Sequence, residues 1–282
     1  MARVAVVTDS TAALPAASPL AADVRIVPLQ VVLDGCVGAE GIDVSPGDVA
    51  AALAARASVS TSRPSPEAFT RAYAAAAASG ATGVVSVHLS RDLSGTIDAA
   101  RLAVPNAPIP VAIVDSRSTA MGLGFPVLAA AAAAGAGADV DVVASAATDA
   151  TRRTRTLFYV DSLDALRRGG RIGQAAAVVG AALLVKPLLE VLDGRIALLE
   201  KVRTASKALA RLQDVALAGC GDDAVDVAVH HLGAESRALT FADALRSRLP
   251  ELRDLHVSEV GAVVGAHVGL GLLGVVVHRR AA

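Results

Sequence analysis

Apolar runs of strand length alternate with helix-forming segments along the first half of this 282-residue chain. The runs are "VAVVTDS" (4–10), "VRIVPLQVVL" (24–33), "VVSVHLS" (84–90) and "VAIVDS" (111–116). Helix signals lie over 45–55, 65–78, from about 95, over 126–134 and over 139–152. Because parallel strands need long, usually helical crossovers, this alternation predicts an α/β domain with a mainly parallel sheet and helices on both faces.

The pattern changes near residue 155. "TRTLFYV" (154–160) reads as a strand, and Asp193–Gly194 separates two strand-like runs, which is a hairpin signal. Further strands are expected at 226–232 and near the C-terminus, with a helix near 235–248. The second half is therefore predicted to be an α+β domain with antiparallel pairing, and the domains are placed at 1–155 and 156–282.

One segment resembles a membrane span. Residues 260–277, "VGAVVGAHVGLGLLGVVV", carry no charge and are long enough to cross a bilayer. They contain five glycines and a histidine, and Gly is unfavourable inside helices. We therefore expect two short strands, "VGAVVG" and "LLGVVV", around a loop, and no stable membrane insertion.

Composition excludes some classes of partner. The net charge is −1 and there is no Trp, with only two Tyr and four Phe. A DNA-binding regulator or an aromatic platform for single-stranded nucleic acid is therefore disfavoured. The two cysteines, Cys36 and Cys220, form no CxxC motif, and the apolar run at the N-terminus is too short for a signal peptide. We expect a cytoplasmic protein without disulfides.

Hydroxyl-rich segments lie at 8–11, 60–66, 89–96 and 115–119, three of them after predicted strands. Helix capping explains any one of them alone. Because parallel strands bring their carboxyl ends to one edge, together they suggest a shared cleft, and hydroxyls beside helix starts suit an anion. No phosphate loop with its lysine is present, so no nucleotide site or other cofactor is predicted.

Basic and histidine residues allow a second interpretation. Arg171 follows Gly169–Gly170, Arg203 follows a predicted strand, and His267 lies in the glycine-rich C-terminal segment. In a stand-alone enzyme acting on a phosphorylated or carboxylate metabolite, these three residues would bind phosphate and transfer protons. Neighbouring His230 and His231 point to opposite faces of a strand, and no spacing supports a metal site.

Six motifs carry a resemblance to a known family. In order they are "VTDST" (7–11), "TSRPSPEAF" (61–69), "LSGT" (93–96), "GGRIG" (169–173), "KVRT" (201–204) and "GAHVGLG" (265–271). In type, order and spacing they resemble the DegV family of bacterial fatty-acid-binding proteins, over essentially the whole chain. The resemblance implies a two-domain α/β protein that holds one long-chain fatty acid in a cleft between its domains.

The resemblance also implies roles for particular residues. Thr61 and Ser94 would hydrogen-bond the fatty acid carboxylate, and the other ligand-binding positions are Ser62, Gly95, Thr96 and His267. Arg171, Arg203 and His267 would support phosphotransfer. The chain would be a lipid-binding carrier without its own nucleotide site, presenting the carboxylate to a separate ATP-dependent fatty acid kinase subunit. The acyl phosphate so formed would serve phospholipid synthesis.

Some positions differ from the family pattern. Arg63 stands where the family often has Gln, and Leu270 stands where Pro is common. Arg91 and Asp92 stand where small or polar residues are common, and "RTASKAL" (203–209) lacks the second basic residue of the usual "RTRKKA". For the acyl tail, the Ala-, Val- and Leu-rich residues 175–192 fit a tunnel wall and equally a core helix.

Overall fold

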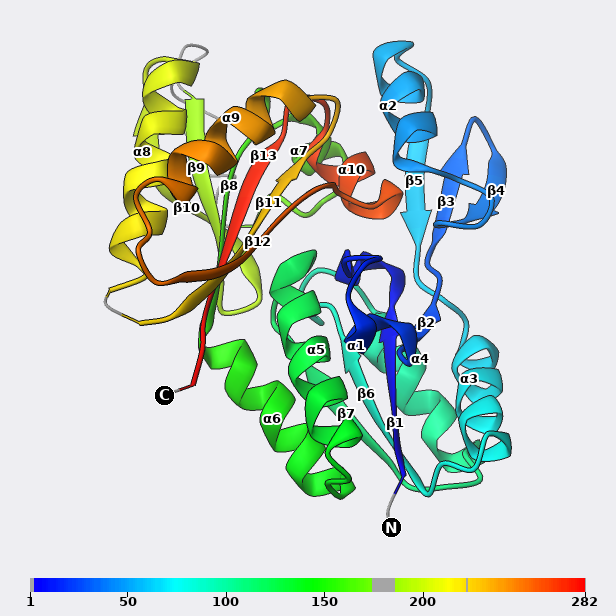
Figure 1. Ribbon diagram of the computed structural model, residues 1–282. Helices are drawn as coiled ribbons and strands as arrows, with labels where there is room; N and C mark the ends of the chain where they lie inside the picture. Colours follow the sequence, from blue (N-terminus) through cyan, green and yellow to red (C-terminus); the bar gives the residue numbers. More distant parts are fainter. Residues whose placement is uncertain (1–2, 174–185, 222, 282) are drawn as a thin grey trace.

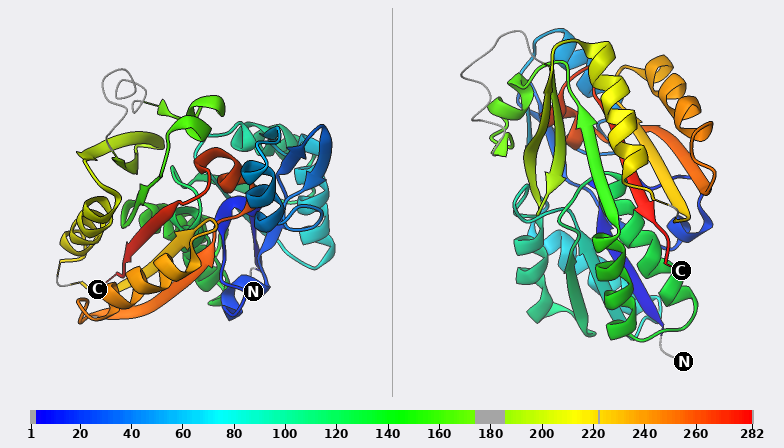
Figure 2. Two further views of the ribbon diagram at one scale, coloured as in Figure 1. Left: turned by 90° about the horizontal axis from the view of Figure 1, so that it is seen from above. Right: turned by 90° about the vertical axis from the view of Figure 1, so that its left-hand side faces the viewer.

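The computed structural model describes residues 3–173, 186–221 and 223–281. Two sheets with their helices form the lower and upper parts of the molecule in Figure 1, and a third, small sheet lies at the upper right. Figure 2 shows that the two large sheets lie one above the other, with the N-terminus at the far end of the lower part.

The first sheet is entirely parallel, in the order β2-β1-β6-β7. Its strands are β1 (Val4–Asp9), β2 (Arg25–Val27), β6 (Gly83–His88) and β7 (Val111–Asp115). The helices of this half are α1 (Pro19–Ala22), α3 (Pro66–Ala78), α4 (Thr96–Ala103), α5 (Met121–Gly135) and α6 (Val140–Arg152), with 3-10 turns at Ser10–Ala12 and Val104–Asn106. One core lies under α5 and α6 and another under α3 and α4. The predicted parallel sheet with helices on both faces is confirmed.

The second sheet has six strands in the order β10-β9-β8-β13-β11-β12. These are β8 (Thr154–Tyr159), β9 (Lys186–Leu192), β10 (Arg195–Val202), β11 (Val225–His231), β12 (Leu252–Glu259) and β13 (Leu273–Arg279). All pairs are antiparallel except β11 with β12. Helices α8 (Ala205–Ala218) and α9 (Glu235–Arg246) cover one face (Figure 1). The α+β character of this half is confirmed.

The predicted hairpin around Asp193–Gly194 is confirmed. β9 and β10 pair antiparallel, and both turn residues have positive φ, 51° and 84°, as a two-residue hairpin turn requires. Of residues 175–192, which fit a tunnel wall and a core helix equally, the part up to residue 185 lies outside the described residues. The domain boundary at residue 155 stays a prediction.

The single strand predicted over 24–33 is wrong. Pro28 separates β2 from β3 (Gln30–Leu33), because proline has no N–H for a sheet ladder. After Pro28 the chain leaves the parallel sheet and enters a small antiparallel sheet, β4-β3-β5, with β4 at Cys36–Ala39 and β5 at Val59–Ser62. Helix α2 (Pro46–Ala54) lies between β4 and β5, and Ser45 caps it as predicted, in a capping box with Asp48.

The strand predicted for "VGAVVG" is also wrong. Residues Ala262–Val268 form α10, and only the later part of the segment forms β13. The Glu40 carboxylate accepts a hydrogen bond from the Val263 backbone N–H (2.8 Å) and so caps the helix start. Gly265 lets α10 approach Leu232 closely, since a Cβ there would stand 3.2 Å from its methyl. Tertiary contacts therefore override the strand preference of this sequence.

Helix α10 joins the small sheet to the second half. Its residues Ala262 and Val263 share a core with Leu29, Val31 and Val49 of the segment before α3, and α10 lies beside α2 in Figure 1. In the described ranges no helix combines the length and the apolar character that a membrane span needs.

Candidate functional site

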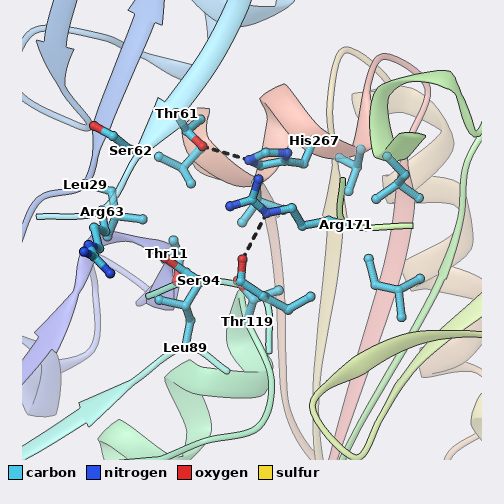
Figure 3. Close-up of a pocket in the computed structure, with 16 residues that line it drawn as sticks. Thr11, Leu29, Thr61, Ser62, Arg63, Leu89, Ser94, Thr119, Arg171 and His267 are labelled. Atoms are coloured by element: carbon cyan, nitrogen blue, oxygen red, sulfur yellow. Dashed lines mark hydrogen bonds between the residues drawn. The ribbon is translucent and has the colours of Figure 1, made fainter. Parts of the chain in front are cut away.

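A cavity lies between the two halves, with an empty volume of about 570 Å³ that includes its opening to solvent. It is called the head cavity below. It is lined from β5, from the loops after β1, β6 and β7, and from α7 (Asp164–Arg168), the turn after it, β10 and α10. Figure 3 shows side chains from these separate segments converging on one space.

Thr61 and His267 meet in this cavity although 206 positions separate them in the chain. Thr61 lies on β5, and its Oγ1 is 2.8 Å from Nε2 of His267 on α10 (Figure 3). Burial, with the nearby Arg171 charge, lowers the pKa of His267 to about 4. The imidazole is therefore neutral at pH 7.

The hydrogen-bond partners of His267 define its tautomer. Nδ1 is buried and has no partner within the described residues, so a proton on Nδ1 would be a buried, unsatisfied donor. We therefore place the proton on Nε2, which donates to the Thr61 hydroxyl oxygen. The Thr61 hydroxyl proton is then free to be donated to an anion in the cavity.

Ser94 also lines the head cavity, at the end of the loop after β6. Its hydroxyl lies 2.9 Å from that of Thr96, the first residue of α4. Thr96 is fully buried, and neither it nor Gly95 is among the described lining residues. Of this predicted group, Ser94 and Ser62 line the cavity, while Thr96 positions the Ser94 hydroxyl.

Arg171 reaches the cavity from the turn after α7. Its Nε donates to the Leu93 carbonyl at 3.0 Å, shown dashed in Figure 3, and its Nη1 donates to the Gly169 carbonyl at 2.5 Å. These bonds fix the guanidinium plane and tie it to the segment that carries Ser94. Since a guanidinium has five N–H donors, donors remain for a ligand.

Arg203 is not brought to this cavity. It is exposed just beyond β10, whereas Ile196, at the other end of the same strand, lines the cavity. At the rise of an antiparallel strand, Ile196 and Arg203 are roughly 20 Å apart. This position gives no support to the role in phosphotransfer that the family resemblance implies for Arg203.

A second, apolar cavity lies directly beside the first and is called the tail channel below. Its empty volume is about 470 Å³, again with its opening. Both cavities are lined by the same five residues at their junction: Leu93, Thr119, Ile196, Val264 and Val268. Beyond them, core residues such as Phe158, Leu272 and Val276 line the tail channel. Three of its polar lining residues differ in their contacts. His230 lies between the Met121 N–H and Ser258, and Thr156 bonds Ser118. The buried Thr119 hydroxyl has no hydrogen-bond partner within the described residues.

Sequence reasoning did not find this channel wall. Of the range proposed as tunnel wall, Val191 lines the tail channel, and residues 174–185 are not described. The other lining residues come from β8, β10, β11, β13, α10 and the loops beside them. Most are ordinary core residues, which give no separate signal in a sequence. Thr119 belongs to a hydroxyl-rich segment noted above, but nothing in the sequence set it apart.

A buried network supports the floor of the head cavity. The Asp9 carboxylate, which is fully buried, accepts hydrogen bonds from the Thr11 hydroxyl (2.6 Å), from the Thr11 and Leu89 backbone N–H groups, and from His88 Nδ1 (3.0 Å). Thr11 and Leu89 both line the head cavity. The "TDST" segment therefore holds cavity residues in place and does not itself present a free carboxylate.

No metal site accompanies the cavity. Across residues 3–173, 186–221 and 223–281, no group of three or more His, Cys, Asp or Glu side chains is placed to hold a metal ion.

These features define a two-domain α/β protein with a ligand cavity between its halves. A model of the family described as "Uncharacterised protein, DegV family" matches residues 3–280. The chain belongs to the DegV family.

Its relatives match over nearly their whole length. A DegV domain-containing protein of Streptomyces coelicolor is 56% identical over 277 residues, covering 98% of this chain and 99% of the relative. One from Mycobacterium tuberculosis is 42% identical over 275 residues, covering 97% and 96%. Both names report the domain and no activity.

Some solved structures of similar proteins are described as binding a fatty acid. A DegV family protein from Thermus thermophilus, described by its fatty acid binding, has a TM-score of 0.91 at 32% identity, covering 99% of this chain and all of that one. DegV from Bacillus subtilis, described as a fatty acid binding protein, has a TM-score of 0.89 at 30% identity, with coverage of 99% and 100%.

Proposed function

We propose that this protein binds a long-chain fatty acid, with the carboxylate in the head cavity and the acyl chain in the tail channel. The observation that carries the proposal is that a polar cavity and an apolar cavity lie side by side and share five lining residues. One end offers hydroxyls and guanidinium groups, and the other offers buried aliphatic side chains. Burial of methylenes at about 0.8 kcal/mol each supplies most of the affinity, and the polar end fixes the position of the head.

We further propose that the bound carboxylate is presented to a separate, cytoplasmic ATP-dependent fatty acid kinase subunit. In that step a carboxylate oxygen attacks the γ-phosphorus of ATP, a P–O bond forms, the bond to the bridging oxygen breaks, and ADP leaves. No proton need be removed from the nucleophile. This fits a cavity whose histidine is neutral, hydrogen-bonded to Thr61 and without a carboxylate partner among the described residues.

Lipid extraction tests the binding proposal. The purified protein is expected to release about one long-chain fatty acid per chain on denaturation, as measured by mass spectrometry. Gly274 on β13 lines the tail channel, and a Cβ there would meet its nearest neighbours at 3.6 Å or more. Gly274→Leu is expected to fill the channel and lose the lipid, while Gly274→Ala keeps it.

The outcomes separate the alternatives. An empty wild-type cavity that also takes up no added oleate or palmitate would contradict the proposal and favour the stand-alone enzyme on a smaller metabolite. Acyl phosphate formation from ATP with no added kinase subunit would contradict the carrier role while leaving lipid binding intact.

Ser94→Ala tests the head group. Loss of one charge-assisted hydrogen bond is expected to weaken fatty acid binding about ten- to a hundredfold, from about 1.5–3 kcal/mol. Isothermal titration with oleate measures it. Ser60→Ala is the matched control, because Ser60 is an exposed serine of β5 that does not line the cavity. Equal affinities in both folded variants would remove Ser94 from the site.

A further inference from the structure

Thr119 carries a buried hydroxyl that is left without a partner. Its Oγ1 makes no hydrogen bond to any group in residues 3–173, 186–221 and 223–281. The two serines of the same segment differ from it: the Ser116 hydroxyl donates to the Ser118 carbonyl at 3.3 Å, and the Ser118 hydroxyl lies 3.0 Å from that of Thr156. A buried hydroxyl without a partner costs free energy, so this one requires an explanation.

Thr119 lies at the junction of the head cavity and the tail channel. This junction is called the neck, and it consists of the residues that line both cavities: Leu93, Thr119, Ile196, Val264 and Val268. The other four neck residues are apolar. In the view of Figure 3, Thr119 lies below Thr61 and His267, which line the head cavity alone. In the proposed binding mode, the carbons nearest to the carboxylate therefore pass Thr119.

The other polar side chains of the described tail-channel lining are Thr156 and His230. The Thr156 hydroxyl pairs with that of Ser118, and both ring nitrogens of His230 have protein partners. A plain methylene chain in the neck would bury the Thr119 hydroxyl against carbon atoms. A chain with its own hydroxyl at that point would pair with it, because a hydroxyl both donates and accepts hydrogen bonds.

We propose, resting on the fatty acid site above, that the preferred ligand is a hydroxy fatty acid and that Thr119 selects it. The ligand hydroxyl lies on one of the first two carbons after the carboxylate, where the chain crosses the neck. The selection also has a direction. Because the rest of the neck is apolar, one enantiomer turns its hydroxyl to Thr119 and the other turns it to carbon.

Competition against a fluorescent fatty acid tests this without any kinase, with myristate, 2-hydroxymyristate and 3-hydroxymyristate as probes. Wild type is expected to bind at least one hydroxy acid as tightly as myristate or more tightly. Thr119→Val keeps the shape of the side chain and removes its hydroxyl. It should weaken that hydroxy acid about tenfold or more. Myristate should bind unchanged or up to about threefold tighter, because valine buries no polar atom beside the methylenes.

Two further variants control for altered folding. Thr119→Ser retains a hydroxyl and should keep the preference for the hydroxy acid. Thr148→Val is the matched control, since it removes a threonine hydroxyl that bonds the Ala144 carbonyl within α6 and lines neither cavity. Its affinities for all three acids should equal those of wild type. The two enantiomers of the hydroxy acid should differ in affinity in wild type, and differ less in Thr119→Val.

The other outcomes are also decisive. Equal losses for myristate and both hydroxy acids in Thr119→Val would overturn the proposal, because the hydroxyl would then contact the carboxylate itself. No change for any of the three acids would overturn it too, because a bound water would then satisfy the hydroxyl. In both cases fatty acid binding stands. If none of the three acids binds to wild type, the proposed function fails as well.

Discussion

Arg171→Ala is expected to keep its fatty acid while a partner kinase forms acyl phosphate at about a hundredth of the wild-type rate or less. In the proposed phosphotransfer step, negative charge would grow on the oxygens around the head cavity. The guanidinium is fixed in advance by the Leu93 and Gly169 carbonyls, so it stabilises that growing charge without a cost of reorganisation. Interactions that strengthen in the transition state act on rate more than on binding.

The assay combines radiolabelled ATP, the kinase subunit and lipid-loaded protein, with lipid content measured in the same sample. Arg171 also donates a hydrogen bond to the Leu93 carbonyl. Loss of this one bond in Arg171→Ala is expected to weaken lipid binding by less than about tenfold. Arg171→Lys is the matched variant: it keeps the charge and loses the planar fork, and should fall between wild type and Ala. A variant that loses its lipid but reacts normally when loaded would make Arg171 a binding residue.

Acid is expected to destabilise this protein well above the pKa of its carboxyl groups. Burial lowers the pKa values of His230, His267 and His278 from 6.5 to about 4. Below about pH 6.5 the unfolded chain binds protons that the folded chain does not, so the free energy of unfolding falls until about pH 4. Each ring contributes up to about 3 kcal/mol to this fall.

His230→Gln isolates one contribution. The Gln amide oxygen can replace Nε2 as acceptor of the Met121 N–H, which His230 now accepts at 3.3 Å. Urea unfolding of wild type and variant between about pH 7 and pH 4.5 should show a smaller loss of stability in the variant, by about 2–3 kcal/mol. The difference is the readout, because burial raises the pKa of Glu40, which acts in the opposite direction. Identical losses in both proteins would contradict the prediction.

Local signals predicted much of the fold from the sequence. A few neighbouring residues were enough to predict these features correctly: the capping box at Ser45, the Asp-Gly turn at 193–194 and the apolar strands β1, β6 and β7. The predicted strand over 24–33 failed at Pro28, where a single missing N–H ends one ladder and the chain changes sheet.

The site depended on contacts that no local pattern contains. Sequence motifs supplied Thr61, Ser94, Arg171 and His267 as candidates, and the structure places all four in one cavity. Residues 260–265 were predicted as a strand and His267 as part of the loop after it, but Ala262–Val268 form one helix. The Glu40 carboxylate caps this helix, and Gly265 lets it pack against Leu232.

The sequence by itself determined the strand–helix order, the halves of different sheet type and the hydroxyl and arginine residues of the head cavity. The spacing of apolar residues, helix caps and turns each depend on a few neighbouring residues, so they can be recognised directly in the sequence. Only the tertiary structure decided that Arg203 lies far from the head cavity and that core residues of β8, β13 and α10 help to enclose a channel. A cavity is space left between packed elements, and its shape and charge depend on how distant segments meet.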